Sequence, residues 1–240
     1  MTGIHLGGGG SEHDEAALWE EAFTPGQRVS IWPFAMPPGP ARTSSVQWFA
    51  GALRTRGEFT IDAWGLQVDD DHAGDEYAGD HHSAERLHRS DVVAIPGGNT
   101  FALLHHLQRH DLLRALGAFL DGGGRVYGGS AGAIVLGADT AIARAEDRND
   151  AGVIDTRGLD RLAGAVVRPH YRPGQQAELR QWAKERQQVV LALPERSGLV
   201  VSGTTEHVTA RNVGPASVQV FTPTGQQDRA AGASWNLRES

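Results

Sequence analysis

Short apolar runs alternate with segments of helical length along most of this chain. Runs such as 4–6, 92–95 and 189–193 have the length of buried strands, and a segment with helical leucine spacing, 101–120, follows the second of them. Alternation of this kind is typical of α/β proteins, because helices make the crossovers between parallel strands. We therefore expect an α/β fold with a mainly parallel sheet flanked by helices.

The last part of the chain gives a different signal. Short apolar runs at 199–201, 208–210 and 218–221 follow one another without a helical segment between them, which favours a terminal antiparallel portion. The polar tail after Pro223, from about residue 224, is expected to be loose. The length of 240 residues suffices for one substantial core, so we expect residues 1–240 to form a single domain.

Composition narrows the possible functions. The net charge is −7 and no basic stripe is present, which disfavours nucleic acid as a partner. The apolar runs fall short of the ~18 residues of a membrane span, and the first residues lack the pattern of a secretion signal. We therefore expect no membrane association and a cytoplasmic location. The chain has no cysteine, so disulfides, thiolate metal sites and a cysteine nucleophile are excluded together.

A serine between glycines is the strongest candidate for covalent chemistry. The segment 128–133, Gly-Gly-Ser-Ala-Gly-Ala, follows an apolar pair at 126–127 and precedes an apolar run at 134–136. This order predicts a strand, a tight turn and a helix, which is the context of a Gly-x-Ser-x-Gly nucleophile elbow. Ser130 is therefore the candidate nucleophile, and the N–H of Ala131 at the start of the helix is a candidate oxyanion donor. The same residue types also suit a purely structural turn.

A serine nucleophile needs a base, an orienting group and oxyanion donors. Among 11 histidines, His170 is the best placed, because it lies just past a predicted strand that ends at Val167. Glu195 follows the predicted strand 189–193 and is placed to accept the imidazole N–H. Gly98 stands at the end of another strand and before a helix, so its N–H is the second candidate oxyanion donor. Each of these residues also fits an ordinary loop.

Four stretches taken together resemble the family of peptidase E and cyanophycinase. They are Ile95–Phe101, Gly128–Ala133, Arg168–Tyr171 and Leu193–Glu195, in the family's order and with similar separations, within about residues 90–200. The resemblance implies a fold related to the class I glutamine amidotransferases, with serine in place of their cysteine. It also implies hydrolysis of short peptides that carry an aspartyl residue at the scissile bond, without a metal or an organic cofactor.

The resemblance implies roles for individual residues as well. The residues at the family's triad positions and then at its oxyanion positions are Ser130, His170, Glu195, Gly98 and Ala131. Asp150 belongs to an Asn-Asp pair that matches a pair in the family's loop after the elbow, which makes it a second candidate for the acid near the site. Either Glu195 or Asp150 could thus orient His170.

The substrate-binding part departs from the family's pattern. The family's dipeptidases carry Gly-Glu-Thr-Arg after the histidine, and this arginine helps to recognise the acidic side chain of the substrate. This chain instead has Pro-Gly-Gln-Gln-Ala-Glu at 173–178. Asn99, Arg168 and Arg172 are the candidate substrate-binding residues, and either arginine would suit a carboxypeptidase that binds a terminal carboxylate. The peptide end that is trimmed, the requirement for aspartate and the oligomeric state, a homodimer included, stay open.

Four alternatives compete with a serine exopeptidase. The segment 69–82 offers aspartates and histidines for a divalent metal, but its spacing fits no standard motif, so we expect no metal. Gly7–Gly10 follows a strand as a phosphate loop would, but no Gly-Lys-Ser/Thr comes after it. Ser130, Asp160 and His207 have the chain order of an ordinary α/β-hydrolase triad. A binding protein that retains an amidotransferase-like fold would leave Ser130 unreactive.

Overall fold

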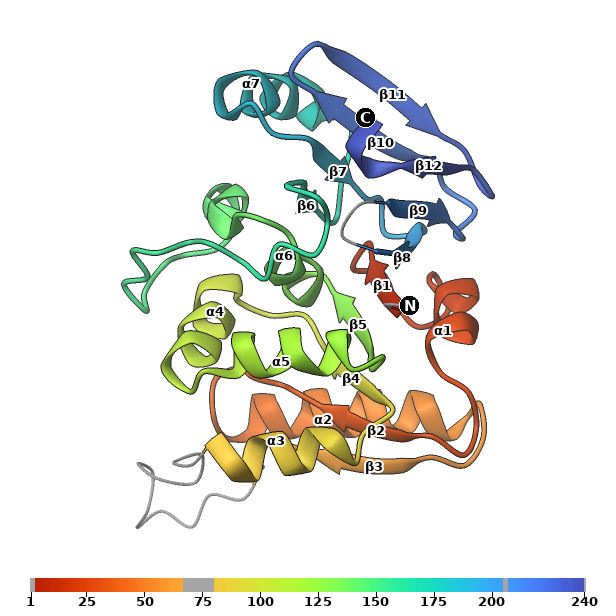
Figure 1. Cartoon of the computed structure of the whole chain (residues 1–240), viewed down its shortest axis with the longest axis vertical. Coiled ribbons are helices and arrows are strands. Elements are labelled where there is room, and N and C mark those ends of the chain that lie inside the picture. Colours follow the sequence, from red (N-terminus) through yellow and green to blue (C-terminus); the bar gives the residue numbers. More distant parts are fainter. Residues whose placement is uncertain (1–2, 67–79, 205–206, 240) are drawn as a thin grey trace.

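The computed structural model describes residues 3–66, 80–204 and 207–239, whose strands form two sheets (Figure 1). The larger sheet has eight strands in the order β12-β9-β8-β1-β5-β4-β2-β3. Their bounds are β1 Gly3–Gly7, β2 Arg28–Ile31, β3 Thr60–Ala63, β4 Val92–Ile95, β5 Arg125–Gly129, β8 Gly198–Gly203, β9 Val208–Asn212 and β12 Ser234–Asn236. Strands β1 to β5 run parallel, and β8, β9 and β12 add an antiparallel edge. The expected α/β fold with a mainly parallel sheet is confirmed.

The smaller sheet has four strands in the order β11-β10-β7-β6. Their bounds are β6 Val166–Arg168, β7 Val190–Ala192, β10 Val218–Thr222 and β11 Gly225–Arg229. Strands β6 and β7 are parallel, whereas β10 pairs antiparallel with both β7 and β11. The terminal antiparallel strands are therefore divided between two sheets, with β8 and β9 in the larger sheet and β10 in the smaller one.

The tail after Pro223, expected to be loose, forms strands β11 and β12. Strand β11 makes a hairpin with β10, and β12 pairs with β9 through Ser234–Asn236. Trp235 is buried in this edge, as is Leu237 in the short helix η3 (Leu237–Glu239). The sequence of β11, Gly-Gln-Gln-Asp-Arg, has no large apolar side chain to bury. This edge strand is therefore held by its backbone pairing with β10.

Helices cover both faces of the larger sheet. On one face lie α1 (Ala16–Ala22) and α2 (Pro40–Arg54), whose side chains share a core cluster with Val92, Ala94 and Tyr127. The alternate strand residues Val93 and Val126 belong to the other cluster, with leucines of the opposite helices. The remaining helices are α3 Asp80–His88, α4 Thr100–Arg109, α5 Leu112–Asp121, α6 Ala131–Leu136, α7 Gln176–Arg186, and the 3₁₀ helices η1 Thr140–Ala145 and η2 Pro173–Gln175. The alternation of side chains along each strand thus builds three layers.

Two helices begin at other residues than their apolar spacing predicts. The apolar spacing of residues 12–23 predicts a helix over that range, but the helix begins only at Ala16, because the Asp14 carboxylate accepts hydrogen bonds from the N–H and the hydroxyl of Ser11 and holds a turn there. The spacing of residues 44–56 predicts a second helix, which begins earlier, at Pro40, since proline is well suited to the first helical position. Neither shift moves the buried face of the helix.

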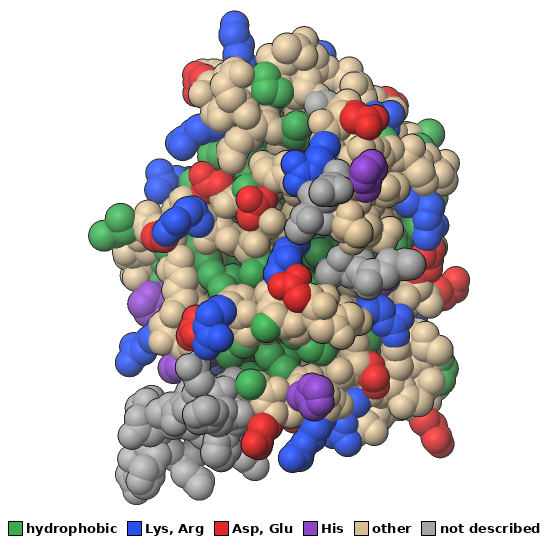
Figure 2. Space-filling view, in the orientation of Figure 1, with side chains coloured by type: hydrophobic (Ala, Val, Ile, Leu, Met, Phe, Trp, Pro, Cys, Tyr) green, Lys and Arg blue, Asp and Glu red, His purple; other side chains and the backbone are tan. Residues whose placement is uncertain are grey.

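The surface mixes both signs of charge. On the face seen in Figure 2, lysine and arginine side chains are interspersed with aspartates and glutamates rather than gathered in one stripe. Among the helices that the structure describes, none combines the length and apolar character that crossing a membrane requires.

Candidate active site

Ser130 lies in a tight turn between β5 and α6. Its backbone has φ 50° and ψ −112°, a region of positive φ that residues other than glycine rarely occupy. Glycines on either side make the turn possible. A Cβ on Gly128 would lie 2.5 Å from the Gly132 carbonyl oxygen, and a Cβ on Gly132 would lie 2.1 Å from that of Ile95. Such strain persists only where the surrounding packing enforces it, and it is concentrated at functional sites.

The Ser130 hydroxyl begins a chain of two hydrogen bonds. Its Oγ lies 3.0 Å from Nε2 of His170, and Nδ1 of the same ring lies 3.1 Å from Oε1 of Glu195. A carboxylate can only accept, so the bond to Glu195 places the ring proton on Nδ1. Nε2 is then left to accept from the Ser130 hydroxyl. The three side chains that the sequence suggested thus meet at one place, where they come from the ends of β5, β6 and β7.

The loop Gly7–Gly10 packs against the imidazole. His170 follows β6 with φ 52°, and its backbone N–H donates to the Gly8 carbonyl at 2.8 Å. The backbone of Gly9 passes directly over the ring, since a Cβ there would lie 2.3 Å from Cε1 and 2.4 Å from Nε2 of His170. In the sheet, Gly7 is in register with Gly129, the residue before Ser130. The absent side chain of Gly9 therefore makes room for His170, whereas those of Gly8 and Gly10 make room for the backbone of Pro194 and Glu195.

Two backbone N–H groups near Ser130, those of Gly98 and Ala131, are available as donors within the part of the chain that the structure describes. Gly98 has φ 143°, and the neighbouring Gly97 packs on Ser130, with a Cβ position 3.1 Å from the Ser130 Cβ. The Gly98 N–H makes no hydrogen bond to another described residue, whereas the next N–H, of Asn99, donates to the Ala35 carbonyl at 2.8 Å. Ala131 is the first residue of α6, so its N–H has no acceptor within the helix. This arrangement suits an oxyanion hole.

Asp150 lies apart from the imidazole. Its carboxylate pairs with Arg148 at 3.2 Å and its side chain is 74% exposed, whereas Glu195 contacts the His170 ring. The loop that carries Asp150 is tied to the start of α4: the Asp147 carboxylate accepts from the Thr100 N–H at 2.8 Å. The structure therefore brings Glu195, and not Asp150, to His170.

The three candidate substrate-binding residues differ in their availability. Asn99 caps α4, and its side-chain amide also donates to the Arg148 carbonyl, so both ends of the amide are engaged. Arg168 is 2% exposed and is held by the Ile142 carbonyl and the Glu146 carboxylate, at 3.0 and 2.6 Å. Arg172 is exposed at the start of η2. Of the two arginines, Arg172 is thus the one that a substrate can reach.

A carboxylate that sequence analysis missed lies under the glycine loop. Glu15, at the start of α1, is 2% exposed, and its oxygens accept from the N–H groups of Gly9 and Gly10 and from the Tyr127 hydroxyl. Burial raises the pKa of Glu15 to about 7, although these three hydrogen bonds act in the opposite direction. The sequence contained one signal, an acidic residue at the start of a helix that follows a run of glycines, but such residues are usually solvated.

The alternative sites that the sequence offered, a metal site and a second hydrolase triad, are not assembled among the described side chains. Among the side chains that the structure describes, those of residues 3–66, 84–204 and 207–239, no three His, Asp or Glu are grouped as a metal site. Most of the candidate metal segment 69–82 lies outside the described residues. His207 is exposed, and no contact joins it or Asp160 to Ser130 in the described part of the chain.

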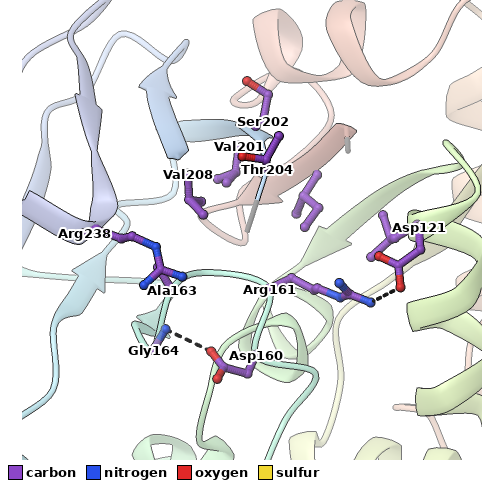
Figure 3. A pocket seen from close by; sticks show the side chains of 13 residues that line it. Asp121, Asp160, Arg161, Ala163, Gly164, Val201, Ser202, Thr204, Val208 and Arg238 are labelled. Atoms are coloured by element: carbon purple, nitrogen blue, oxygen red, sulfur yellow. Dashed lines mark hydrogen bonds and ion pairs between the residues drawn. The ribbon is translucent and has the colours of Figure 1, made fainter. Parts of the chain in front are cut away.

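A cavity of about 490 Å³ lies between residues of β8 and the segment 160–164 (Figure 3). It adjoins Ile4 near the start of β1, whereas Ser130 follows the last residue of β5, which is paired with the last residue of β1. Ile4, Leu120 and Val201 line it, together with Arg161, which is paired with Asp121 at 2.8 Å. The cavity is therefore separate from the Ser130 site.

Comparisons with known proteins agree with this geometry. The model of peptidase family S51 matches residues 63–209, a stretch that includes Ser130, His170 and Glu195. Peptidase E of Streptomyces coelicolor is 31% identical over 191 residues, which is 74% of this chain and 69% of that protein. Peptidase E of Actinobacillus pleuropneumoniae serotype 5b is 33% identical over 127 residues, 49% of this chain. The match covers 53% of the Actinobacillus protein, so the chain spans about half the length of that relative.

Solved structures show the same fold. A peptidase from an acI-B1 actinobacterium superimposes with a TM-score of 0.64 at 19% identity, covering 98% of this chain and 97% of that one. A protein of Listeria monocytogenes EGD-e gives a TM-score of 0.68 at 19% identity, over 88% of this chain and 98% of its own. At this identity the likeness concerns the fold alone. The family model, by contrast, matches a stretch of sequence that contains the candidate site residues. The resemblance to peptidase E is thereby confirmed, and the chain belongs to peptidase family S51.

Proposed function

We propose that this chain is a serine exopeptidase that hydrolyses short peptides by way of an acyl-enzyme on Ser130. The observation that carries the proposal is the hydrogen-bonded chain from the Ser130 hydroxyl through His170 to Glu195, with bonds of 3.0 and 3.1 Å. A strained turn that presents a hydroxyl to an imidazole has little structural use. It has a direct use in nucleophilic catalysis.

The first half of the reaction forms the acyl-enzyme. The Ser130 oxygen attacks the carbonyl carbon of the peptide while Nε2 of His170 takes its proton. The imidazolium that results is stabilised by Glu195 at Nδ1. The charge that develops on the carbonyl oxygen is stabilised by the N–H groups of Gly98 and Ala131, which donate without reorganisation. His170 then protonates the leaving amine, and the C–N bond breaks.

The second half repeats these steps with water. Water enters the place of the amine, gives a proton to Nε2 of His170 and attacks the acyl carbon. The ester bond to Ser130 breaks, and the serine oxygen recovers the proton. Apart from the attacking water, every step uses side chains and backbone amides of this chain.

We propose that peptides containing aspartate are the substrates. The resemblance of the four sequence stretches to the peptidase E family supports this specificity, and the exposed Arg172 is the candidate to bind an acidic group of the peptide. Gly-Glu-Thr-Arg is absent after His170. The cationic residue that binds the substrate's acidic group must therefore stand at another sequence position here than in the family's dipeptidases.

A small peptide panel tests the proposed function. Purified protein is incubated with Asp-X, X-Asp, N-acetyl-Asp-X and matched Asn-containing peptides, and the released amino groups are quantified. We expect cleavage of the unblocked Asp-X peptides and cleavage of the Asn analogues that is slower by about ten-fold or more. Cleavage by Ser130→Ala should be slower than by the wild type by about 1,000-fold or more. Equal cleavage of the Asp and Asn peptides would contradict the specificity. An absence of hydrolysis throughout the panel would contradict the proposed exopeptidase activity.

The choice of the third triad member makes a separate prediction. Glu195→Gln keeps the size of the side chain but removes the charge that stabilises the imidazolium, so we expect kcat to fall by orders of magnitude, though by less than in Ser130→Ala. Asp150→Asn changes a carboxylate that is paired with Arg148 in solvent, and its kcat is expected to stay within about two-fold of wild type. Steady-state kinetics on one peptide compare the two variants. A larger loss in Asp150→Asn than in Glu195→Gln would assign the orienting acid to Asp150.

A further inference from the structure

A buried carboxylate joins the strand that leads to Ser130 with the loop that contacts His170. Oε1 of Glu15 accepts from the N–H groups of Gly9 and Gly10, at 2.8 and 3.1 Å. Its other oxygen accepts from the hydroxyl of Tyr127 at 2.7 Å, and this hydroxyl in turn accepts from Nε1 of Trp19 at 3.2 Å. Tyr127 lies on β5, three residues before Ser130. Glu15 thus links the glycine loop to strand β5 through hydrogen bonds.

The glycine loop also contacts His170, the candidate base. Gly8 accepts the backbone N–H of His170 at 2.8 Å, and Gly9 faces the imidazole so closely that a Cβ would lie 2.3 Å from Cε1. Gly10 lies against the backbone of Glu195, since a Cβ there would be 2.4 Å from the Glu195 carbonyl oxygen. The position of the glycine loop therefore sets where the ring can lie.

Four successive glycines would not hold this position alone. Gly7–Gly10 has no side chain to pack, and glycine loses more conformational freedom on ordering than any other residue. General-base catalysis depends on the distance between the base and the hydroxyl within a few tenths of an ångström. Gly7 is paired in the sheet and the Gly8 N–H donates to the Ser197 carbonyl at 3.3 Å. The N–H groups of Gly9 and Gly10 lie beyond the sheet, and Glu15 is their fixed acceptor.

We propose that Glu15 is a positioning residue, which holds the glycine loop behind His170 so that the imidazole meets the Ser130 hydroxyl. This inference rests on the proposed roles of Ser130 and His170. A buried carboxylate costs free energy that an apolar side chain would not, so its presence at a fold-only position would be unfavourable. Its three hydrogen bonds instead go to the groups that carry the site.

Several ionisable groups surround this carboxylate. Tyr127 faces it from β5, His170 lies across Gly9, and Glu195 lies across Gly10. Arg56 stacks on Trp19, with 5.0 Å from the guanidinium carbon to the ring centroid, and Asp14 is the preceding residue in the turn. The Tyr127 hydroxyl has its pKa raised well above the usual value by burial and by Glu15, so it stays a donor to the carboxylate.

Glu15→Gln tests the inference with a side chain of the same size. The amide has a single oxygen, so its NH₂ group must face either the glycine N–H groups or the Tyr127 hydroxyl, and a donor is left without an acceptor. We expect kcat to fall by about 10- to 100-fold and KM to change less than two-fold. The rate at which a serine-directed phosphonate labels Ser130 should fall with kcat, because both need the base in place. Glu20→Gln, which neutralises an exposed carboxylate on the same helix, should keep the wild-type rates.

The outcomes separate this inference from the proposed function. A Glu15→Gln variant with wild-type kcat, or one that raises KM alone, overturns the positioning role even if its Tm has fallen. If this variant does not fold, Glu15→Asp gives the same reading, because it keeps the charge but is too short to reach the loop and Tyr127 together. His170→Ala is measured beside it. A wild-type rate in His170→Ala overturns the proposed function, whereas a loss there with a normal Glu15 variant overturns only this inference.

The ionisation of Glu15 should also change the thermal stability of the protein with pH. In the unfolded chain Glu15 ionises near 4.5, and burial raises its native pKa to about 7. As the pH rises from 4.5 through 7, the native state binds more protons at this site than the unfolded state, so native stability is lost. Glu15→Gln removes this loss. The Tm of the variant minus that of wild type should therefore increase from pH 4.5 to 8, and a constant difference would contradict the burial on which the positioning role depends.

Discussion

Replacing Ser130 by alanine is expected to lower kcat by about 1,000-fold or more while the chain stays folded. The substitution removes the attacking oxygen and leaves the base and the oxyanion donors without a nucleophile. The methyl side chain fits the same turn, since the Ser130 hydroxyl does not cap α6. Turnover of the best peptide of the panel measures the effect, and circular dichroism and Tm report on the fold. Undiminished turnover by this variant would reject Ser130 as the nucleophile.

Ser130→Gly is the matched control for strain in this turn. Glycine tolerates the backbone of φ 50° and ψ −112° that serine and alanine adopt only at a cost. The glycine variant should therefore be as inactive as Ser130→Ala, but its free energy of unfolding should be higher than that of Ser130→Ala by about 1 kcal/mol. Greater stability combined with lost activity would indicate that the native residue is retained for its hydroxyl. A glycine variant that is less stable than Ser130→Ala would contradict the strain.

His170→Ala is expected to give a loss of similar size, about 1,000-fold in kcat. Without the imidazole, the serine hydroxyl has no group to take its proton, and the leaving amine has no acid. Because the two side chains act as a unit, the double variant Ser130→Ala/His170→Ala should be no slower than Ser130→Ala alone. Steady-state turnover of the three variants on one peptide measures this non-additivity.

An exposed histidine provides the control for this prediction. His105→Ala on α4 removes an imidazole that lies in solvent, and its kcat should match wild type. A loss in the double variant equal to the product of the two single losses would mean that Ser130 and His170 act independently. That outcome would contradict the hydrogen-bonded pair as the catalytic unit.

The sequence predicts the parallel half of the fold well and the terminal half less well. Runs such as 92–95 are apolar throughout because both sheet faces are covered by helices, so their signal is strong. Strand β11 is polar and lies at an edge, where pairing with β10 rather than burial determines its structure. The division of the last strands between two sheets depends on long-range pairing with β7 and β9, which local patterns do not encode.

In the candidate site, the residues that could be predicted are those with a recognisable local sequence context. Ser130 stands in a recognisable strand–turn–helix segment, and His170 and Glu195 follow strands whose ends meet at one edge of the fold. The burial of Arg168 was not predictable, because it depends on Ile142 and Glu146 on another segment. Glu15 was missed for the same reason: its partner Tyr127 is 112 residues away in the chain.

Mass spectrometry of the protein after reaction with a serine-directed phosphonate tests the central claim most directly. If the hydroxyl at the elbow is activated by the imidazole beside it, one adduct should form per chain and peptide mapping should place it on Ser130. Labelling should disappear in Ser130→Ala and become at least 100-fold slower in His170→Ala. An adduct on another serine, or labelling of Ser130 at an unchanged rate without His170, would contradict the account.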